Sequence, residues 1–178
     1  LTPASDVSPM AAEAADWHLP EVKLPSAAKP YAIVVTGIGG TGVVTIGALL
    51  GMAAHIEGKG CSVLDMAGLA QKGGAVISHV RIGARPEDIH AVRVSAGGAK
   101  LVLGCDLVVA GSFDALSKIQ QGTTRAVINA HETITSDFIH NPDLSFPERE
   151  LREAISDSTG PGNTDFLDAT RIANALLG

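Results

Sequence analysis

The stretch VTGIGGTGV, residues 35–43, decides how this chain folds. It fits the pattern GxGxxG and joins an uncharged, β-branched segment, Tyr31–Thr36, to an apolar segment with helical spacing, Thr41–Glu57. A glycine-rich turn between a buried strand and a helix is typical of the first βα unit of a doubly wound sheet. We therefore expect an α/β fold with an open, mostly parallel, Rossmann-like sheet and helices on both faces.

The rest of the chain continues the alternation of strands and helices. Further strands are expected at residues 61–65, 75–82, 106–111, 126–129 and 165–169, with 90–94 as an additional edge strand. Further helices are expected at residues 112–121, within the acidic segment 142–157, and at 170–177. Residues 1–30 hold five of the nine prolines and no glycine, so we expect a linker or arm there and one α/β domain over residues 31–178.

Composition excludes several classes of protein. With 178 residues and a hydrophobic fraction of 46%, the chain can close one core. A net charge of -6 and an aromatic fraction of 3% argue against a nucleic-acid binder. Four glycines within the six residues 37–42 interrupt the uncharged stretch 30–56. A membrane helix would not tolerate them, so no membrane contact is expected. Two isolated cysteines, Cys61 and Cys105, form no metal site and indicate a cytoplasmic, reducing compartment.

The first glycine loop is a candidate phosphate site. Gly37 permits a tight turn, and Gly39 and Gly40 allow a ligand or another backbone to approach. Gly42 lets the helix lie close to the strand. These glycines and Thr41 stand at the N-terminus of the expected helix, where anions bind. A purely structural role, in which the glycines only allow strand and helix to pack closely, explains the same residues.

A second loop of small residues, 66–74, carries Gln71, Lys72, Gly73 and Gly74. We expect both loops at the carboxyl ends of neighbouring strands, where they would face one crevice and hold a phosphate-bearing ligand or the backbone of a partner. An exposed loop with a solvated lysine is the alternative. Asp65 stands near the usual spacing for an acid that binds a ribose hydroxyl, which keeps a dinucleotide site open.

Four candidate residues outside these loops, His79, Arg81, Cys61 and Cys105, have structural explanations. His79 and Arg81 share one face of the expected strand 75–82, and we expect the arginine to pair with an acid across the sheet. Each cysteine opens an expected buried strand and is interpreted as an inert core residue. The sequence contains no metal-ligand spacing and no nucleophile pattern, so neither a metal ligand nor a catalytic residue is assigned.

Residues 37–42, together with the run LDMAGLAQKGGAVISHVR at 64–81, resemble the gamma domain of thiamine-dependent 2-oxoacid:ferredoxin oxidoreductases, and within them the long bacterial indolepyruvate ferredoxin oxidoreductases. The resemblance covers roughly residues 31–178. It implies an enzyme that oxidatively decarboxylates an aryl 2-oxoacid to an acyl-coenzyme A. Such an enzyme uses thiamine diphosphate, Mg²⁺ and iron–sulfur clusters, and passes electrons to ferredoxin.

The resemblance also implies that this chain is not active alone. It lacks the Gly-Asp-Gly stretch that holds the thiamine diphosphate metal in such enzymes, and many relatives have arginine where Lys72 stands. Because the family domain usually continues past Gly178, a fragment or a subunit of a larger enzyme is expected. Its role would be scaffolding and docking of other domains or subunits, with a share in binding coenzyme A or a nucleotide phosphate. A free-standing nucleotide-binding regulatory module and a NAD-dependent dehydrogenase domain are the alternatives.

Overall fold

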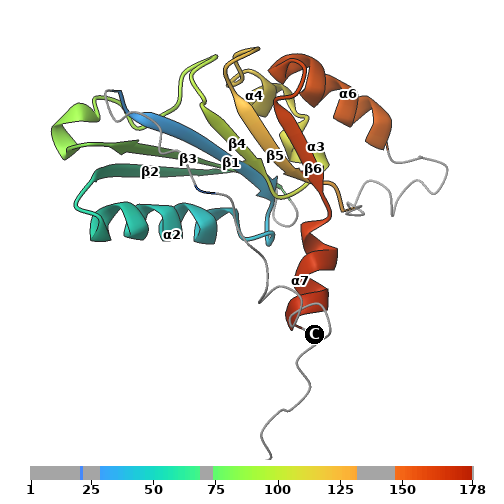
Figure 1. The fold of residues 1–178 in the computed structure, drawn as a ribbon, viewed down its shortest axis with the longest axis horizontal. Helices are drawn as coiled ribbons and strands as arrows, with labels where there is room; N and C mark the ends of the chain where they lie inside the picture. Colours follow the sequence, from blue (N-terminus) through green and yellow to red (C-terminus); the bar gives the residue numbers. More distant parts are fainter. Residues whose placement is uncertain (1–20, 22–28, 69–73, 132–146, 178) are drawn as a thin grey trace, which may run out of the picture.

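A computed structural model describes residues 21, 29–68, 74–131 and 147–177 of the chain. Six strands form one sheet in the order β2-β3-β1-β4-β5-β6 (Figure 1). The strands are β1 (Tyr31–Ile38), β2 (Gly60–Ala67), β3 (Ala75–Gly83), β4 (Leu101–Gly104), β5 (Arg125–Asn129) and β6 (Thr164–Leu167). The helices are α2 (Val43–Ile56), the 3-10 turn η1 (Pro86–Asp88), α3 (Leu107–Ala110), α4 (Phe113–Leu116), α6 (Glu148–Thr159) and α7 (Ala169–Leu177).

The sheet is mixed. Strands β1, β4, β5 and β6 are parallel, whereas β3 runs antiparallel to both of its neighbours, β1 and β2. The connection between β2 and β3 is too short for the crossover that a parallel pair needs, so these strands pair as a hairpin. In a Rossmann sheet the second strand lies beside the first. Here β3 lies between them, and the pairings of β3 with β1 and β2 are antiparallel. The expectation of an open, mostly parallel, Rossmann-like sheet is therefore met only in part.

Helices cover both faces of the sheet, as predicted (Figure 1). Helix α2 packs on one face against β1, β2 and β3, and the short helices α3 and α4 lie with α6 on the other. The two faces of β1 therefore belong to different clusters. Ile33 and Val35 pack with residues of α2, while Ala32 and Val34 pack with residues of α3 and α6.

Helix α2 lies close against the sheet because its inward face contains small residues. A Cβ added to Gly47 would lie 2.6 Å from the hydroxyl oxygen of Ser78 on β3, which only glycine avoids. Val43, Gly47 and Ala54 are buried there, as the helical spacing predicted. Within the described residues, no helix is long and apolar enough to cross a membrane.

Two predicted strands are wrong. The segment 106–111 is not a strand: β4 lies just before it, and Asp106 caps the short helix α3 by accepting a hydrogen bond from Val109 N at 2.8 Å. A short apolar run fits a buried strand and a buried helix equally, so its pattern could not separate them. Residues 90–94 form no strand either. The helix expected at 112–121 shortens to α4, whose N-terminus is capped by the Ser112 side chain.

Some predicted features fall outside the described residues. Of the proline-rich arm at 1–30, only positions 21, 29 and 30 are described. The helix predicted within 142–157 is α6, which begins at Glu148, and the part of that segment before residue 147 lies outside the described residues. The predicted last strand and helix are β6 and α7, displaced by a residue or two.

Candidate functional site

The first glycine loop is a closed turn between β1 and α2. Thr41 donates two hydrogen bonds to the carbonyl oxygen of Ile38, one from its backbone nitrogen at 3.0 Å and one from its hydroxyl at 2.7 Å. Gly40 and Gly42 have φ angles of 100° and 87°, in the left-handed region that glycine tolerates best. The loop therefore has a fixed shape that depends on glycine at these two positions.

The N-terminus of α2 is open to an anion. No side chain caps the helix, and its first turn contains no acidic residue. The unpaired N–H groups of a first turn and the helix dipole together attract negative charge. A hollow of about 260 Å³ lies beside this terminus, and its lining consists of Ile38, Gly40, Gly42, Val43, Val44, Thr45 and Val76.

The two glycine loops meet at one edge of the sheet. The backbone nitrogen of Gly39 donates to the carbonyl oxygen of Gly74 at 2.9 Å, so the end of β1 is joined to the start of β3. For this pair of residues the loops share an edge, but β3 lies between β1 and β2, so the expectation that the loops follow neighbouring strands is wrong. Gln71, Lys72 and Gly73 lie outside the described residues, and their proposed contacts with a ligand remain a prediction.

The glycines of the first loop do not share one role. A Cβ on Gly37 would lie 2.3 Å from the Thr41 hydroxyl oxygen and 2.9 Å from Cβ of Cys105, so this glycine serves close packing. Gly40 and Gly42 are needed because the backbone is left-handed at these two positions. Gly39 has neither constraint, because its added Cβ would meet only Gly74 O at 3.6 Å and Val76 at 4.0 Å. It is the position of the loop at which added bulk would test the approach of a ligand most directly.

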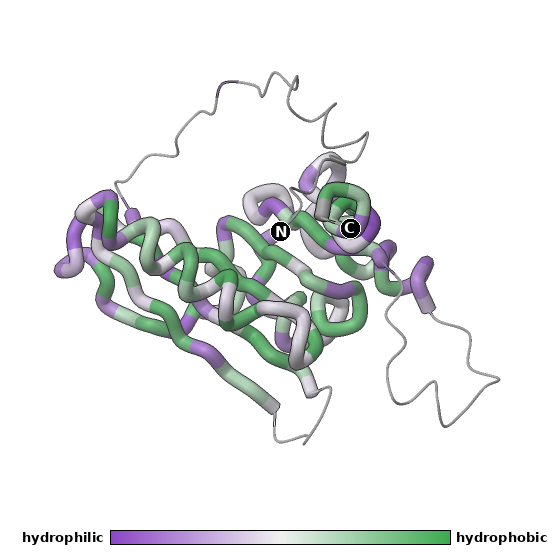
Figure 2. The backbone as a smooth tube through the Cα atoms, turned by 90° about the horizontal axis from the view of Figure 1, so that it is seen from below, coloured by the Kyte–Doolittle hydropathy of each residue, from purple (hydrophilic) through white to green (hydrophobic). Residues whose placement is uncertain are grey.

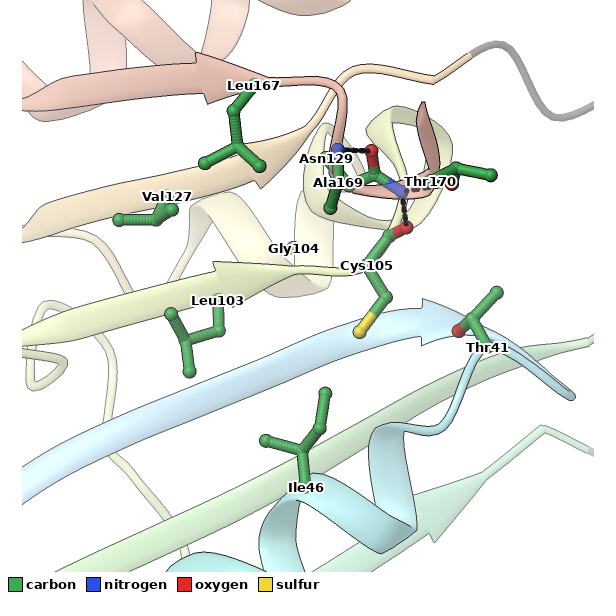
Figure 3. A pocket seen from close by; sticks show the side chains of 10 residues that line it. All are labelled: Thr41, Ile46, Leu103, Gly104, Cys105, Val127, Asn129, Leu167, Ala169 and Thr170. Carbon is green, nitrogen blue, oxygen red and sulfur yellow. Dashed lines mark hydrogen bonds between the residues drawn. The ribbon is translucent and has the colours of Figure 1, made fainter. Parts of the chain in front are cut away.

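A cavity of about 420 Å³ lies at the same edge of the sheet, on the face that carries α2 (Figure 3). It was not predicted from the sequence. Its lining consists of Thr41, Ile46, Leu103, Gly104, Cys105, Val127, Asn129, Leu167, Ala169 and Thr170. Burial raises the pKa of the Cys105 thiol, the neighbouring Asp106 carboxylate adds to this rise, and a hydrogen bond with Thr41 opposes it. The thiol is therefore protonated and unreactive at neutral pH, as expected.

Hydrogen bonds of the Asn129 side chain join the segments that line one side of this cavity. Its amide nitrogen donates to the carbonyl oxygen of Cys105 at 3.1 Å and to the hydroxyl of Thr170 at 3.2 Å. Its amide oxygen accepts from Ala169 N at 3.0 Å and from His131 N at 3.3 Å. The end of β5 is thereby tied to the turn after β4 and to the start of α7. An asparagine at the end of an apolar strand is the only signal of this role in the sequence.

The polar residues of β3 have structural roles. Nδ1 of the buried His79 accepts a hydrogen bond from Val94 N at 3.3 Å. Burial lowers the pKa of His79, and the positive charges of Arg93 and Lys118 lower it further. The acid expected for Arg81 is not found: among the described residues it has no ion pair, and Nη1 donates instead to the carbonyl oxygen of Arg93 at 3.4 Å.

Asp65 does not complete a dinucleotide site with the first loop. It lies on β2 and pairs with Ser78 of β3, so a whole strand separates it from β1. The described residues also contain no group of three or more histidine, cysteine or acidic side chains able to hold a metal ion.

Comparison with known proteins identifies the family. The family of pyruvate ferredoxin/flavodoxin oxidoreductases matches residues 32–177. The chain belongs to this family. This confirms the resemblance seen in the two glycine loops.

Curated relatives of this family member include two archaeal proteins named indolepyruvate oxidoreductase subunit IorB. The protein of Thermococcus kodakarensis is 40% identical over 82 residues, which are 46% of this chain and 39% of the relative. That of Archaeoglobus fulgidus is 30% identical over 125 residues, which are 68% of this chain and 59% of the relative. This family member thus spans only part of the length of either relative.

Solved structures of the family share the fold. The pyruvate oxidoreductase subunit PORC from Thermotoga maritima superposes with a TM-score of 0.55 at 19% identity, over 82% of this chain and 65% of that one. The 2-oxoglutarate:ferredoxin oxidoreductase from Magnetococcus marinus gives a TM-score of 0.51 at 15% identity, over 82% of this chain and 21% of that one.

Proposed function

We propose that this chain is the gamma-type domain of an indolepyruvate-type 2-oxoacid:ferredoxin oxidoreductase. In this role it docks against the other domains or subunits and holds a phosphate group of coenzyme A or a nucleotide at the first glycine loop. The complete cytoplasmic enzyme would decarboxylate an aryl 2-oxoacid to an acyl-coenzyme A and reduce ferredoxin. Family membership and the IorB relatives support this proposal over a regulatory module or a NAD-dependent dehydrogenase domain.

The redox cofactors of such an enzyme would lie in its other parts. An iron–sulfur cluster needs several cysteines within one small site. Cys61 is on β2 and Cys105 follows β4, so three strand spacings, at least about 14 Å, separate them. The described residues therefore do not fit a cluster. We likewise assign thiamine diphosphate and Mg²⁺ to other domains or subunits.

The exposed side of α2 carries the docking role. Helix α2 has no Asp, Glu, Lys or Arg, and Figure 2, seen from the side of this helix, shows hydrophobic residues along its length. Val44, Leu49, Met52 and Ile56 are 50%, 64%, 59% and 77% exposed. Contiguous apolar surface of this kind marks protein interfaces. We call these four residues the α2 stripe and propose that an apolar surface of another subunit of the oxidoreductase covers it.

The phosphate role rests on the first glycine loop and the uncapped start of α2. The anion would meet unpaired backbone N–H groups without repulsion from a carboxylate in the first turn. The M. marinus relative was solved with coenzyme A bound, which supports coenzyme A as a ligand class to test.

Titration calorimetry of the full chain with coenzyme A, ATP and NAD tests this role. We expect coenzyme A or ATP to bind, and Gly39→Val to weaken that binding while Gly39→Ala, the smaller step, weakens it less. Binding of NAD alone would favour the dehydrogenase alternative. Binding of none of the three would overturn both the phosphate role and the regulatory alternative. The docking role would then be tested separately, by co-purification with the other subunits or domains of the oxidoreductase.

A further inference from the structure

The cavity lies where the winding of the sheet reverses. From β1 the chain crosses one face through α2 and reaches β2, on one side of β1. From β4 it crosses the other face through α3 and α4 to β5, and through α6 to β6, on the opposite side. The reversal falls between β1 and β4. In open α/β sheets, ligands bind outside the carboxyl ends of the strands at such a point.

The walls of the cavity suit an uncharged ring. Leu103, Val127 and Leu167 line it from the sheet, and Ile46 lines it from α2 (Figure 3). No charged side chain is among its lining residues. A volume of about 420 Å³ lies within the usual range of small-molecule sites. A flat heteroaromatic ring would thus gain apolar contacts without leaving a buried charge unpaired.

Two hydroxyl groups offer hydrogen bonds at the polar end. All four hydrogen bonds of the Asn129 amide are used within the protein, so this residue supports the site without meeting a ligand. The Thr170 hydroxyl accepts from Asn129 and keeps its own hydrogen to donate. The Thr41 hydroxyl donates to Ile38 and, beside its contact with the Cys105 thiol, keeps one lone pair to accept. The pair supplies one donor and one acceptor, which the edge of a nucleobase can use.

We propose that this cavity receives the nucleobase of the phosphate-bearing ligand whose phosphate lies at the first glycine loop. The proposal rests on the phosphate role proposed above. Thr41 connects the two sites, because it belongs to the loop and also lines the cavity. A nucleotide bound in this way would lie across the start of α2, with its charged end at the loop and its uncharged end over β4 and β5.

Protection of Cys105 from alkylation tests the proposal in the unmodified protein. Cys105 lines the cavity, whereas Cys61 lies on β2 and serves as an internal control. Because burial raises the pKa of both thiols, iodoacetamide labelling is followed by mass spectrometry at alkaline pH. ADP should slow labelling of Cys105 and leave Cys61 unchanged. Inorganic pyrophosphate, which has no base, should protect neither.

A cavity-filling variant gives a second measurement. Val127→Phe places a ring in the proposed base site, and Val92→Phe adds the same ring at an exposed position as a control. We expect Val127→Phe to weaken ADP binding by about tenfold or more and to leave pyrophosphate binding unchanged. Gly39→Val should weaken the binding of both ligands.

The outcomes separate this proposal from the phosphate role. If pyrophosphate and ADP bind equally well and ADP does not protect Cys105, the cavity holds no base and only the phosphate role stands. If adenosine protects Cys105 while pyrophosphate does not bind, the cavity takes the base and the phosphate role is overturned. If neither ADP nor adenosine protects Cys105, the base-site proposal is rejected.

Discussion

The buried carboxylate of Asp106 accepts a hydrogen bond from the backbone nitrogen of Ile38 at 2.7 Å. Its other oxygen accepts from Val109 N at 2.8 Å, in the first turn of α3. One side chain thus joins the last residue of β1 to the turn after β4, across the point where the winding reverses. The start of the first glycine loop and the rim of the cavity are thereby held in a fixed relation.

Loss of this carboxylate should destabilise the fold. Asp106→Ala leaves two backbone N–H groups without their acceptor, and we expect it to lower the free energy of unfolding by about 2 to 4 kcal/mol. Asp106→Asn retains one acceptor and should lose about half as much. Urea denaturation measures both, with Asp114→Ala, which removes an exposed acid of α4, as the control. An Asp106→Ala variant as stable as this control would show that the link contributes little.

The glycines of the loop should differ in their tolerance of a methyl group. Gly37→Ala forces contacts shorter than 3 Å with Thr41, Val43 and Cys105, and should cost about 1 to 3 kcal/mol by overpacking. Gly39→Ala meets only ordinary contacts and should leave the free energy of unfolding nearly unchanged. Thermal unfolding of this matched pair checks the assignment, which equal losses in both variants would contradict.

The strands and helices that were predicted correctly are those whose ends coincide with a change in residue type along the sequence. The glycines after Tyr31–Thr36 marked the end of β1 and the start of α2, because Gly37 packs too closely for a Cβ and Gly40 and Gly42 adopt the left-handed backbone. The run Leu107–Ala110 gave no such boundary. Its capping residue, Asp106, was the available signal, since an aspartate immediately before an apolar run marks a candidate helix start.

Features built from distant segments could not be predicted in this way. The direction of β3 depends on how the chain returns after β2, and nothing within the strand itself encodes it. The cavity brings together Thr41, Cys105, Asn129 and Thr170, which lie at or just after the ends of four different strands of the sheet. Of the four, only Thr41 is part of a local motif. Such a site emerges only once the order of the strands is known.

Charges on the α2 stripe should prevent assembly and leave the domain folded. Leu49→Lys with Met52→Lys changes two side chains that are 64% and 59% exposed, so the core is not affected. We expect the variant to have the circular dichroism spectrum of the parent and to fail to co-purify with the other subunits or domains of the oxidoreductase. Phe113→Lys, at an 85% exposed position on the opposite face, is the matched control and should assemble normally. Normal assembly of the double variant would reject the α2 stripe as the docking surface.

Protonation of His79 should contribute to the pH dependence of the free energy of unfolding. Because its pKa is lower in the folded protein than the value of about 6.5 in an unfolded chain, the unfolded state binds more protons over the interval between the two values. The contribution of the neutral His79 side chain to the free energy of unfolding should therefore be fully present above a pH of about 6.5 and decrease as the pH falls below that value. His79→Asn keeps an acceptor for Val94 N and cannot be protonated, so its urea midpoint should change less between pH 8 and pH 5.5, values chosen to bracket about 6.5. His55→Asn, at an exposed position on α2, should retain the slope of the parent; an unchanged slope in His79→Asn would mean that other groups cause the loss of stability.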